Sequence, residues 1–349
     1  MRRLSLRFEE WPEADRTMWA ELTTKAGPLD PRGPLSHLEE PSRGNLVTSY
    51  GYWLGWLNAN HPGAFVESPV ERATPERVTA WMTCVSHLRP DTRLACLEKA
   101  LRVLKAYAPD HDWTMQIRLA SLLRHELHTS PSTRKRGRII ASDVLFQAGL
   151  SLVEDLNSGG TPASLKEAQQ RRDGVMIMML AVLPMRRRSF VALELGQTLT
   201  VSGDRISVVL ETPDTKNHRV WETEVPASLA SPLLSYIRDV RPWFLTRRDT
   251  QHMRLWSNDS GRPYCAIHLG ARITRLTEKY VGARVCPHLF RDCAATTLAY
   301  DSPDAARLIR ALLGHSTFRT AERHYNQARA INDGRTYASL LEDIRKGTK

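Results

Sequence analysis

Four polar residues within the stretch 287–325 have types and spacing suited to catalysis. His288 and Arg291 stand three residues apart, so a helix would place them on one face. His315 follows a glycine at which a helix is expected to end, and Tyr325 comes ten residues later. Because a histidine can transfer a proton, a tyrosine can attack an electrophile and an arginine can bind an anion, the stretch is the first candidate for chemistry.

Two cations from earlier in the chain, Arg186 and Lys216, extend this group to six residues. Paired guanidinium groups can hold the oxygens of a phosphodiester and stabilise the charge of its transition state. A tyrosine hydroxyl can attack the phosphorus while a histidine accepts its proton, and a lysine can protonate the departing oxygen. The six residues include no paired carboxylates and no Ser-His-Asp order. The pattern therefore favours metal-free attack on a phosphate ester, with no cofactor.

Each of these residue types, taken alone, is more often structural: a core histidine, a packing tyrosine or a solvated lysine. Arg187 and Arg188 stay open as alternatives for the first catalytic arginine, because three arginines follow one another. Tyr300 and Tyr337 are alternatives for the tyrosine, but they are expected in a helix core and in a C-terminal apolar stripe.

The elements that must position these residues begin with a helical N-terminal half. Residues 1–42 are rich in proline, glycine and charge, and they predict an irregular extension. Residues 43–130 have helical periodicity and predict a small all-α domain of four helices. Residues 131–139 predict a basic linker, whose cations can bind a phosphate backbone or simply be solvated. These linker cations are Arg134, Lys135, Arg136 and Arg138.

Residues 140–349 predict a second, catalytic domain that carries all six candidate residues. Helices are expected over 141–156, 165–183, 229–240 and 265–280. A three-stranded antiparallel meander, with Lys216 near its second turn, is expected over 198–201, 205–210 and 219–225. A last helix, 333–346, carries an apolar stripe: Tyr337, Leu340, Leu341 and Ile344. The predicted fold class is mainly α with a small antiparallel β-sheet (α+β).

The composition indicates which class of partner the protein binds and in which cellular compartment it acts. The chain has 349 residues, with 49 Lys and Arg against 38 Asp and Glu, and a net charge of +11. A basic excess favours a nucleic acid partner, although a merely soluble basic protein would show it too. Five cysteines without a CxxC pair fit a reducing cytosol, and the spacing of Cys286, His288 and Cys293 matches no common zinc site. No signal-peptide core opens the chain, and the longest apolar run, 175–184, is about half a membrane span.

Five short motifs combine into a more specific pattern: LPMRRRSFVAL (183–193), TKN (215–217), HLFRD (288–292), LLGHS (312–316) and AERHY (321–325). In this order they resemble the tyrosine recombinase (phage integrase-like) family of site-specific DNA recombinases. The likeness spans residues 140–346, and the helical N-terminal half is similar to the family's core-binding domain by architecture alone. The chain departs from the family at Ser189, where an acidic residue is common, and no separate arm-binding domain is evident.

The resemblance implies a role for each of the six residues. Tyr325 would attack the scissile phosphate and leave a 3′-phosphotyrosyl bond and a 5′-hydroxyl, while Arg186 and Arg291 hold the phosphate. Lys216 would be the general acid. His288 would be the general base or an orienting donor, and His315 would donate a hydrogen bond to a non-bridging oxygen. Because the covalent link conserves the bond energy, neither ATP nor a metal would be required.

The resemblance also implies that the protein forms a C-shaped clamp on double-stranded DNA with specific recombination sites. Arg187, Arg188 and the linker cations would bind this DNA. Four protomers would exchange strands through a Holliday junction, in integration, excision, transposition or resolution of a mobile element. A partner recombinase or accessory protein would be compatible with this role, and helix 333–346 would dock on a neighbouring protomer. The setting would be cytoplasmic and nucleoid-associated, in a bacterial or phage-type context.

Two alternatives stay open. One is a monomeric enzyme that relaxes DNA, similar to the type IB topoisomerases, with the same chemistry but no strand exchange. The other is a DNA-binding regulator that kept the fold and lost catalysis. The occupied catalytic positions favour an enzyme over the regulator.

Overall fold

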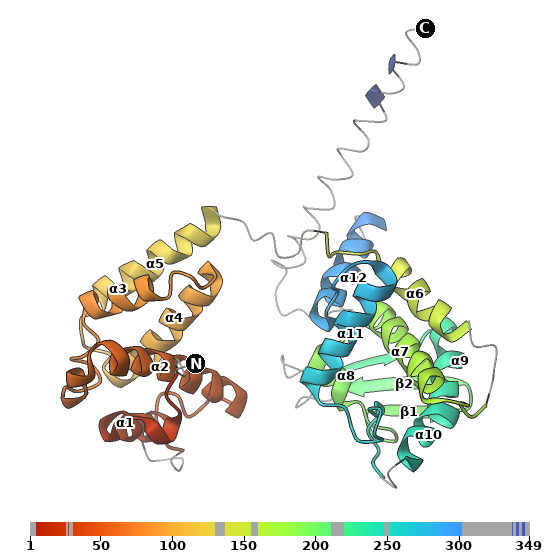
Figure 1. The fold of residues 1–349 in the computed structure, drawn as a ribbon, viewed down its shortest axis with the longest axis horizontal. Coiled ribbons are helices and arrows are strands. Elements are labelled where there is room, and N and C mark those ends of the chain that lie inside the picture. Colours follow the sequence, from red (N-terminus) through yellow and green to blue (C-terminus); the bar gives the residue numbers. More distant parts are fainter. Residues whose placement is uncertain are drawn as a thin grey trace. The chain divides into compact units, whose positions relative to one another are not determined.

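A computed structural model describes residues 5–25, 27, 31–129, 137–154, 160–210, 220–247 and 251–301, with positions 337, 340, 341, 344 and 345 near the C-terminus. The chain divides into two compact units, Met1–Thr133 and Arg134–Lys349 (Figure 1). The described residues form many helices and one three-stranded antiparallel sheet, so the predicted fold class is confirmed. No helix in these ranges is both long and apolar enough to cross a membrane.

The N-terminal unit is helical throughout its regular elements. They are η1 (Phe8–Glu10), α1 (Glu13–Thr23), α2 (Glu40–Asn60), η2 (Pro62–Val66), α3 (Pro75–Cys84), α4 (Pro90–Tyr107) and α5 (Thr114–Thr129). Prolines begin α3 and α4, where no amide hydrogen is needed, and the Thr74 side chain caps α3 by accepting from the amide of Arg77. The core is rich in tryptophan, and the rings of Trp53 and Trp81 lie 5.3 Å apart. The four helices expected in this half correspond to α2 to α5.

The prediction of an irregular extension over 1–42 is wrong where η1, α1 and the start of α2 lie within it, whereas 31–39 contain no helix or strand. Helix α1 lies within this range and buries Met18, Trp19 and Leu22 against the core of the unit. Asp15 of α1 is fully buried and accepts hydrogen bonds from the Tyr50 hydroxyl at 2.7 Å and from Arg72 Nη1 at 2.8 Å. The sequence pattern missed this helix because its stability comes from partners that lie far away in the chain.

The Asp15–Arg72 pair gives a stability prediction. Replacing Arg72 with alanine leaves a buried carboxylate without its countercharge, so we expect a loss of about 3–5 kcal/mol in the free energy of unfolding. Arg77 is the matched control, because it pairs with Glu67 where both side chains are partly exposed. Arg77→Ala should cost far less. Denaturant unfolding followed by tryptophan fluorescence measures both, and equal losses would contradict this account.

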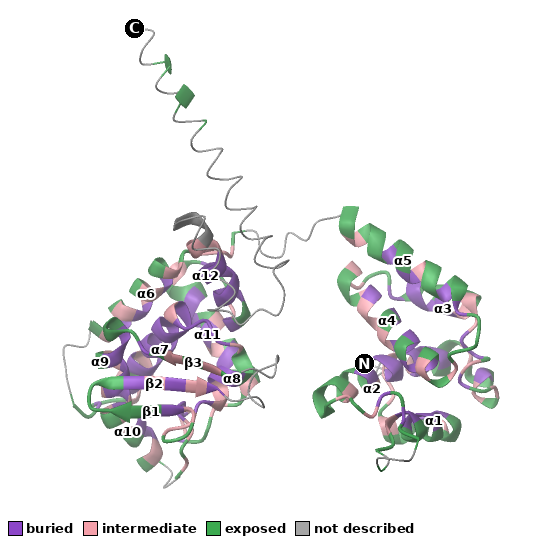
Figure 2. Ribbon diagram, turned by 180° about the vertical axis from the view of Figure 1, so that it is seen from behind, coloured by how far each residue is buried: buried purple, intermediate pink, exposed green. Residues whose placement is uncertain are grey.

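The C-terminal unit is built around one buried helix. Its helices are α6 (Ser142–Glu154), α7 (Leu165–Val182), α8 (Arg187–Ala192), α9 (Ala227–Ser235), the π-helical turn η5 (Tyr236–Val240), α10 (Arg241–Thr246), α11 (Ala266–Val281) and α12 (Pro287–Asp301). Every residue of α7 from Arg171 to Ala181 is buried (Figure 2). Helix α6 crosses α7 at close range, since a Cβ on Gly149 would lie 2.7 Å from the carbonyl oxygen of Gly174. Helix α7 therefore organises the core on which the other elements pack.

The predicted meander is confirmed in the described residues as β1 (Leu199–Ser202), β2 (Arg205–Leu210) and β3 (Trp221–Glu224), paired antiparallel in that order. The side chains of β2 alternate, so that Ile206, Val208 and Leu210 face the core. The predicted helix 229–240 is instead divided, with a π-helical turn between α9 and α10. Pro242 in the first turn of α10 lacks an amide hydrogen, which explains why the α-helical pattern is interrupted upstream of it.

A buried network of charges fixes α11 against α7. Arg172 is fully buried and its Nη1 donates to Asp259 at 2.8 Å, while its Nε and Nη2 donate to the adjacent Asp173. Asp173 in turn accepts hydrogen bonds from Arg272 of α11. Burial alone would raise the pKa of the Asp259 carboxyl, but the nearby Arg172 guanidinium lowers this pKa below its usual value. The network holds α11, and with it the turn that leads into α12.

Candidate active site

Two of the predicted catalytic arginines, Arg186 and Arg291, lie where the N-terminal end of α8 meets helix α12. Arg291 lies on α12, is 7% exposed, and donates from Nη1 to the carbonyl oxygen of Pro184 at 2.7 Å. Pro184 stands two residues before Arg186, the N-cap of α8. This bond joins segments 107 residues apart and brings the two arginines into one electrostatic environment.

Two positively charged side chains influence each other at this place. The pKa of Arg291 is lowered to about 10, mainly by burial and also by the positive charge of Arg186, while Asp292 opposes the shift. Burial also lowers the pKa of Arg186, which is half-buried. Both side chains stay protonated at neutral pH, so two neighbouring guanidinium groups repel each other in the free protein. An anion bound between them would relieve this repulsion.

Because of this repulsion, we expect Arg186 to lower the free energy of unfolding. Replacing Arg186 with glutamine keeps most of the aliphatic chain but removes one of the two charges, so we expect the free energy of unfolding to rise by about 0.5 kcal/mol. Arg187→Gln is the control, because Arg187 is exposed on the surface and does not contribute to the pKa shift of Arg291. Thermal and denaturant unfolding at low ionic strength measure both variants. A loss of stability in the Arg186 variant alone would contradict the proposed repulsion.

His288 occupies the first turn of α12, and its side chain is exposed. It stands one turn before Arg291, so the predicted helical pairing of the two residues is confirmed. The N-terminus of a helix carries a partial positive charge from its unpaired amides, which also favours an anion at this end of α12. Arg186, His288 and Arg291 are therefore the predicted catalytic residues whose positions the structure describes.

The other predicted catalytic residues, Lys216, His315 and Tyr325, lie outside the described residues, as do Arg134, Lys135 and Arg136 of the linker. Their roles stay predictions. Within the described ranges, no group of three or more histidine, cysteine, aspartate and glutamate side chains is placed to hold a metal ion. All five cysteines are among the described residues, and each is a free thiol.

Two side chains from a later segment of the chain donate hydrogen bonds to main-chain carbonyls of helix α8. Trp256 donates from its indole nitrogen to the Phe190 carbonyl at 3.0 Å, and Arg254 donates from Nη1 to the Ala192 carbonyl at 2.5 Å. Ser189, at the position where the resemblance leads one to expect an acidic residue, is buried. These contacts fix the helix that begins at Arg186.

A basic groove lies next to this pair and was missed by the sequence analysis. Arg187, Arg275 and Arg284 line it, from α8, α11 and the turn before α12, around a volume of about 600 Å³. Gly270 of α11 makes room for Arg187, because a Cβ there would lie 3.0 Å from Arg187 Cδ. Arg187 and Arg188 are both exposed. The spacing of Arg272, Arg275 and Lys279 along α11 is a helical signal that could have predicted a basic face on α11, of which Arg275 lines this groove.

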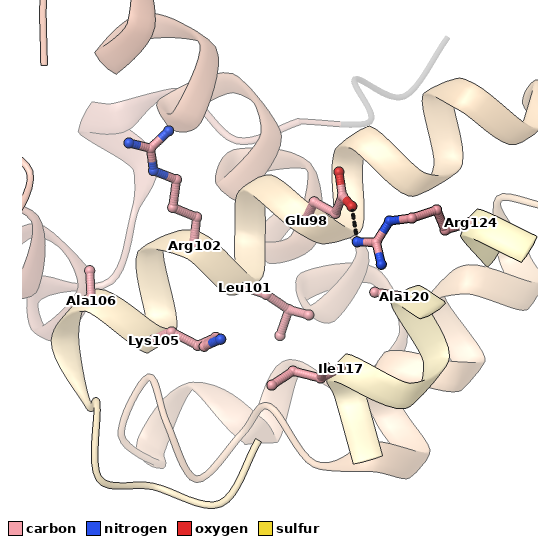
Figure 3. A pocket seen from close by; sticks show the side chains of 8 residues that line it. All are labelled: Glu98, Leu101, Arg102, Lys105, Ala106, Ile117, Ala120 and Arg124. Carbon is pink, nitrogen blue, oxygen red and sulfur yellow. Dashed lines mark hydrogen bonds and ion pairs between the residues drawn. The ribbon is translucent and has the colours of Figure 1, made fainter. Parts of the chain in front are cut away.

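A second groove lies in the N-terminal unit between α4 and α5. Leu101 and Ile117 face each other across it, and the Arg124 guanidinium reaches Glu98 (Figure 3). Arg102 and Lys105 also line this groove, so its floor is apolar and its rim is mainly basic.

The two units together have known structural counterparts. No protein-family model matches the sequence, and no curated protein sequence matches it either. The structure is similar to the XerH site-specific recombinase bound to palindromic difH substrate in a post-cleavage complex, with a TM-score of 0.60, 14% sequence identity and coverage of 97% of this chain and 99% of that chain. The XerH complex with difH before cleavage is also similar, with a TM-score of 0.57, 12% identity and coverage of 92% and 96%.

The chain has the fold of the site-specific tyrosine recombinases. This confirms, at the level of the fold, the family that the sequence motifs resemble. Within the recombinase fold, the described part of the candidate site consists of the Arg186–Arg291 pair, the exposed His288 and the adjacent basic groove.

Proposed function

We propose that this protein is a site-specific tyrosine recombinase, which cleaves and rejoins double-stranded DNA through a 3′-phosphotyrosyl intermediate. The observation that carries the proposal is the pair of neighbouring guanidinium groups, Arg186 and Arg291, in a recombinase fold. Two neighbouring guanidinium groups offer several charged N–H donors to an anion, and a phosphodiester has two non-bridging oxygens to accept from them.

The proposed mechanism uses six side chains. Tyr325 attacks the phosphorus, the bond to the 5′ oxygen breaks, and the DNA is left attached to the tyrosine through its 3′ phosphate. Arg186 and Arg291 stabilise the extra negative charge of the transition state. His288 accepts the proton from the tyrosine, and His315 donates a hydrogen bond to a non-bridging oxygen. Lys216 donates a proton to the departing 5′ oxygen. Attack by the free 5′-hydroxyl reverses these steps, so no metal or nucleotide is consumed.

Arg186 fits the role of the first catalytic arginine better than its two neighbours. It is half-buried and influences the pKa of Arg291, whereas Arg187 and Arg188 are exposed. We assign Arg187 and Arg188 to the DNA phosphates on either side of the cleaved one, together with Arg275 and Arg284 in the adjacent groove. The net charge of +11 supports a polyanionic partner.

We further propose that the active form is a tetramer on two DNA duplexes, which exchange strands through a Holliday junction in integration, excision, transposition or resolution. The support is an apolar stripe near the C-terminus, with helical backbone at each described position. Tyr337, Leu340, Leu341 and Ile344 are 64%, 56%, 43% and 64% exposed. Exposed apolar side chains at helical spacing fit docking on a neighbouring protomer. A DNA substrate and free thiols are consistent with action in the cytoplasm, at the nucleoid.

A DNA-relaxing enzyme is the second candidate, because it would use the same arginine pair and the same tyrosine. The exposed C-terminal stripe favours the recombinase, since a monomer would have no partner to cover it. The two candidates differ in product: a recombinase joins strands from different duplexes, whereas a relaxing enzyme changes only the topology of a plasmid. The inactive regulator would form neither product.

The decisive experiment is capture of the covalent intermediate. Nicked duplexes that cover the DNA on both sides of the gene are incubated with the protein, so that the short strand with the 5′-hydroxyl is lost and rejoining is blocked. We expect a protein–DNA adduct that survives denaturation, forms equally well in EDTA and is mapped to a tyrosine by mass spectrometry. An adduct that requires magnesium, or hydrolysis without any adduct, would refute the mechanism.

A further inference from the structure

The segment 138–142, here called the strap, is fastened to helix α12 and to the turn before it. Arg138 donates from both Nε, at 2.7 Å, and Nη2 to the carbonyl oxygen of Arg284. Further along, the amide of Ile140 donates to Cys293 Sγ at 3.4 Å, and the amide of Ser142 donates to Thr297 Oγ1 at 2.9 Å. The strap therefore follows α12 over its first three turns.

The strap and the candidate site lie on opposite sides of α12. Successive residues of an α-helix are rotated by about 100°. On this basis Cys293 and Thr297 point about half a turn away from His288 and Arg291. Cys293 is fully buried, whereas His288 is exposed. A displacement of the strap would consequently move the helix along with the catalytic groups on its far side.

The turn before α12 is held from its other side as well. Thr277 of α11 accepts from the amide of Val285 at 2.9 Å and donates to the carbonyl oxygen of the same residue at 3.1 Å. Arg138 and Thr277 thus clamp two successive residues, 284 and 285, just ahead of Pro287. Of these bonds, the pair from the Arg138 guanidinium is charge-assisted and therefore the strongest.

We propose that Arg138 is a positioning residue, which holds the N-terminal end of α12 through the Arg284 carbonyl and thereby aligns Arg291 and His288 with the scissile phosphate. The proposal deepens the recombinase function and rests on it. It assigns Arg138 a task different from that of a phosphate contact, the role that the sequence suggested for this linker cation. Two of its donor nitrogens are already engaged by the protein, so the guanidinium is committed to a fixed geometry before DNA binds.

The test compares Arg138→Ala and Arg138→Lys in the full chain, with Arg205→Ala as a charge-matched control. Arg205 is an exposed arginine on β2 with a long contact to Glu224. Single-turnover cleavage is measured at saturating DNA, and affinity is measured across a salt series. For Arg138→Ala we expect cleavage to slow by about 10- to 100-fold, the cost of misplacing a catalytic group by an ångström or less. Affinity and its salt dependence should stay unchanged, Arg138→Lys should restore part of the rate, and Arg205→Ala should cleave like the wild type.

The opposite pattern would overturn the proposal. A phosphate contact predicts weaker binding and a salt slope smaller by about one, with an unchanged rate at saturation. Hydrogen–deuterium exchange of the free protein gives a readout that needs no cleavage: Arg138→Ala should accelerate exchange in residues 284–291, and unchanged exchange would also overturn the positioning role. If the wild type forms no adduct, the proposed recombinase function is refuted. The hydrogen–deuterium exchange result would still show whether Arg138 fixes α12.

A second variant guards against a simple folding defect in Arg138→Ala. Thr297→Val preserves the shape of the side chain and removes the acceptor for the Ser142 amide. It should slow cleavage in the same direction, and its effect should not add to that of Arg138→Ala, because both release one strap. Wild-type cleavage by Thr297→Val, or strict additivity of the two effects, would contradict the strap as a unit.

Discussion

Replacing Tyr325 with phenylalanine is expected to abolish the covalent protein–DNA adduct while leaving DNA binding intact. The substitution removes only the phenolic oxygen, which is the proposed nucleophile, and retains the aromatic ring. Adduct formation on nicked duplexes and DNA affinity by mobility shift measure the two effects separately.

Tyr300 and Tyr337 provide the matched controls for this variant. Tyr300 lies on α12 and Tyr337 belongs to the exposed C-terminal stripe. The Tyr300→Phe and Tyr337→Phe variants should both form the adduct, and the wild-type adduct should map to Tyr325 in a peptide digest. Should Tyr325→Phe form the adduct in undiminished yield, the nucleophile has been misassigned.

Replacing Arg291 with alanine is expected to slow cleavage at saturating DNA by about 10²–10³-fold, the usual cost of removing one preorganised transition-state donor. Arg291 is buried and already anchored to the Pro184 carbonyl, so its guanidinium does not have to be ordered when DNA binds. Arg291→Lys should recover only part of the rate, because an ammonium group cannot bond two phosphate oxygens in the fork geometry of a guanidinium.

Arg241 is the matched control for the loss of a buried arginine. It is 6% exposed and donates to the carbonyls of Arg254 and His252, neither of which is a candidate catalytic residue. Arg241→Ala should reduce the free energy of unfolding, yet cleave at the wild-type rate under conditions where the variant is folded. If both variants lose the same fraction of activity, the effect of Arg291 is structural rather than catalytic.

The predictable part of this protein consists of patterns between neighbouring residues. Helical spacing placed His288 and Arg291 on one helix, and α12 carries both. Alternating apolar residues predicted the meander, and β2 buries Ile206, Val208 and Leu210 as expected. The order of the motifs predicted the recombinase fold, which the structural comparison confirms despite 14% identity. The first two signals are local, because backbone periodicity is set by contiguous residues. The third needs only the order of short motifs along the chain.

What only the tertiary structure decided is which distant residues share an environment. Helix α1 was missed because Asp15 gains its partners from Tyr50 and Arg72. The proximity of Arg186 to Arg291, and the bond from Arg138 to the Arg284 carbonyl 146 residues away, follow from how the helices pack on α7. No periodicity along the chain encodes such contacts, since their free energy exists only once both segments are in place.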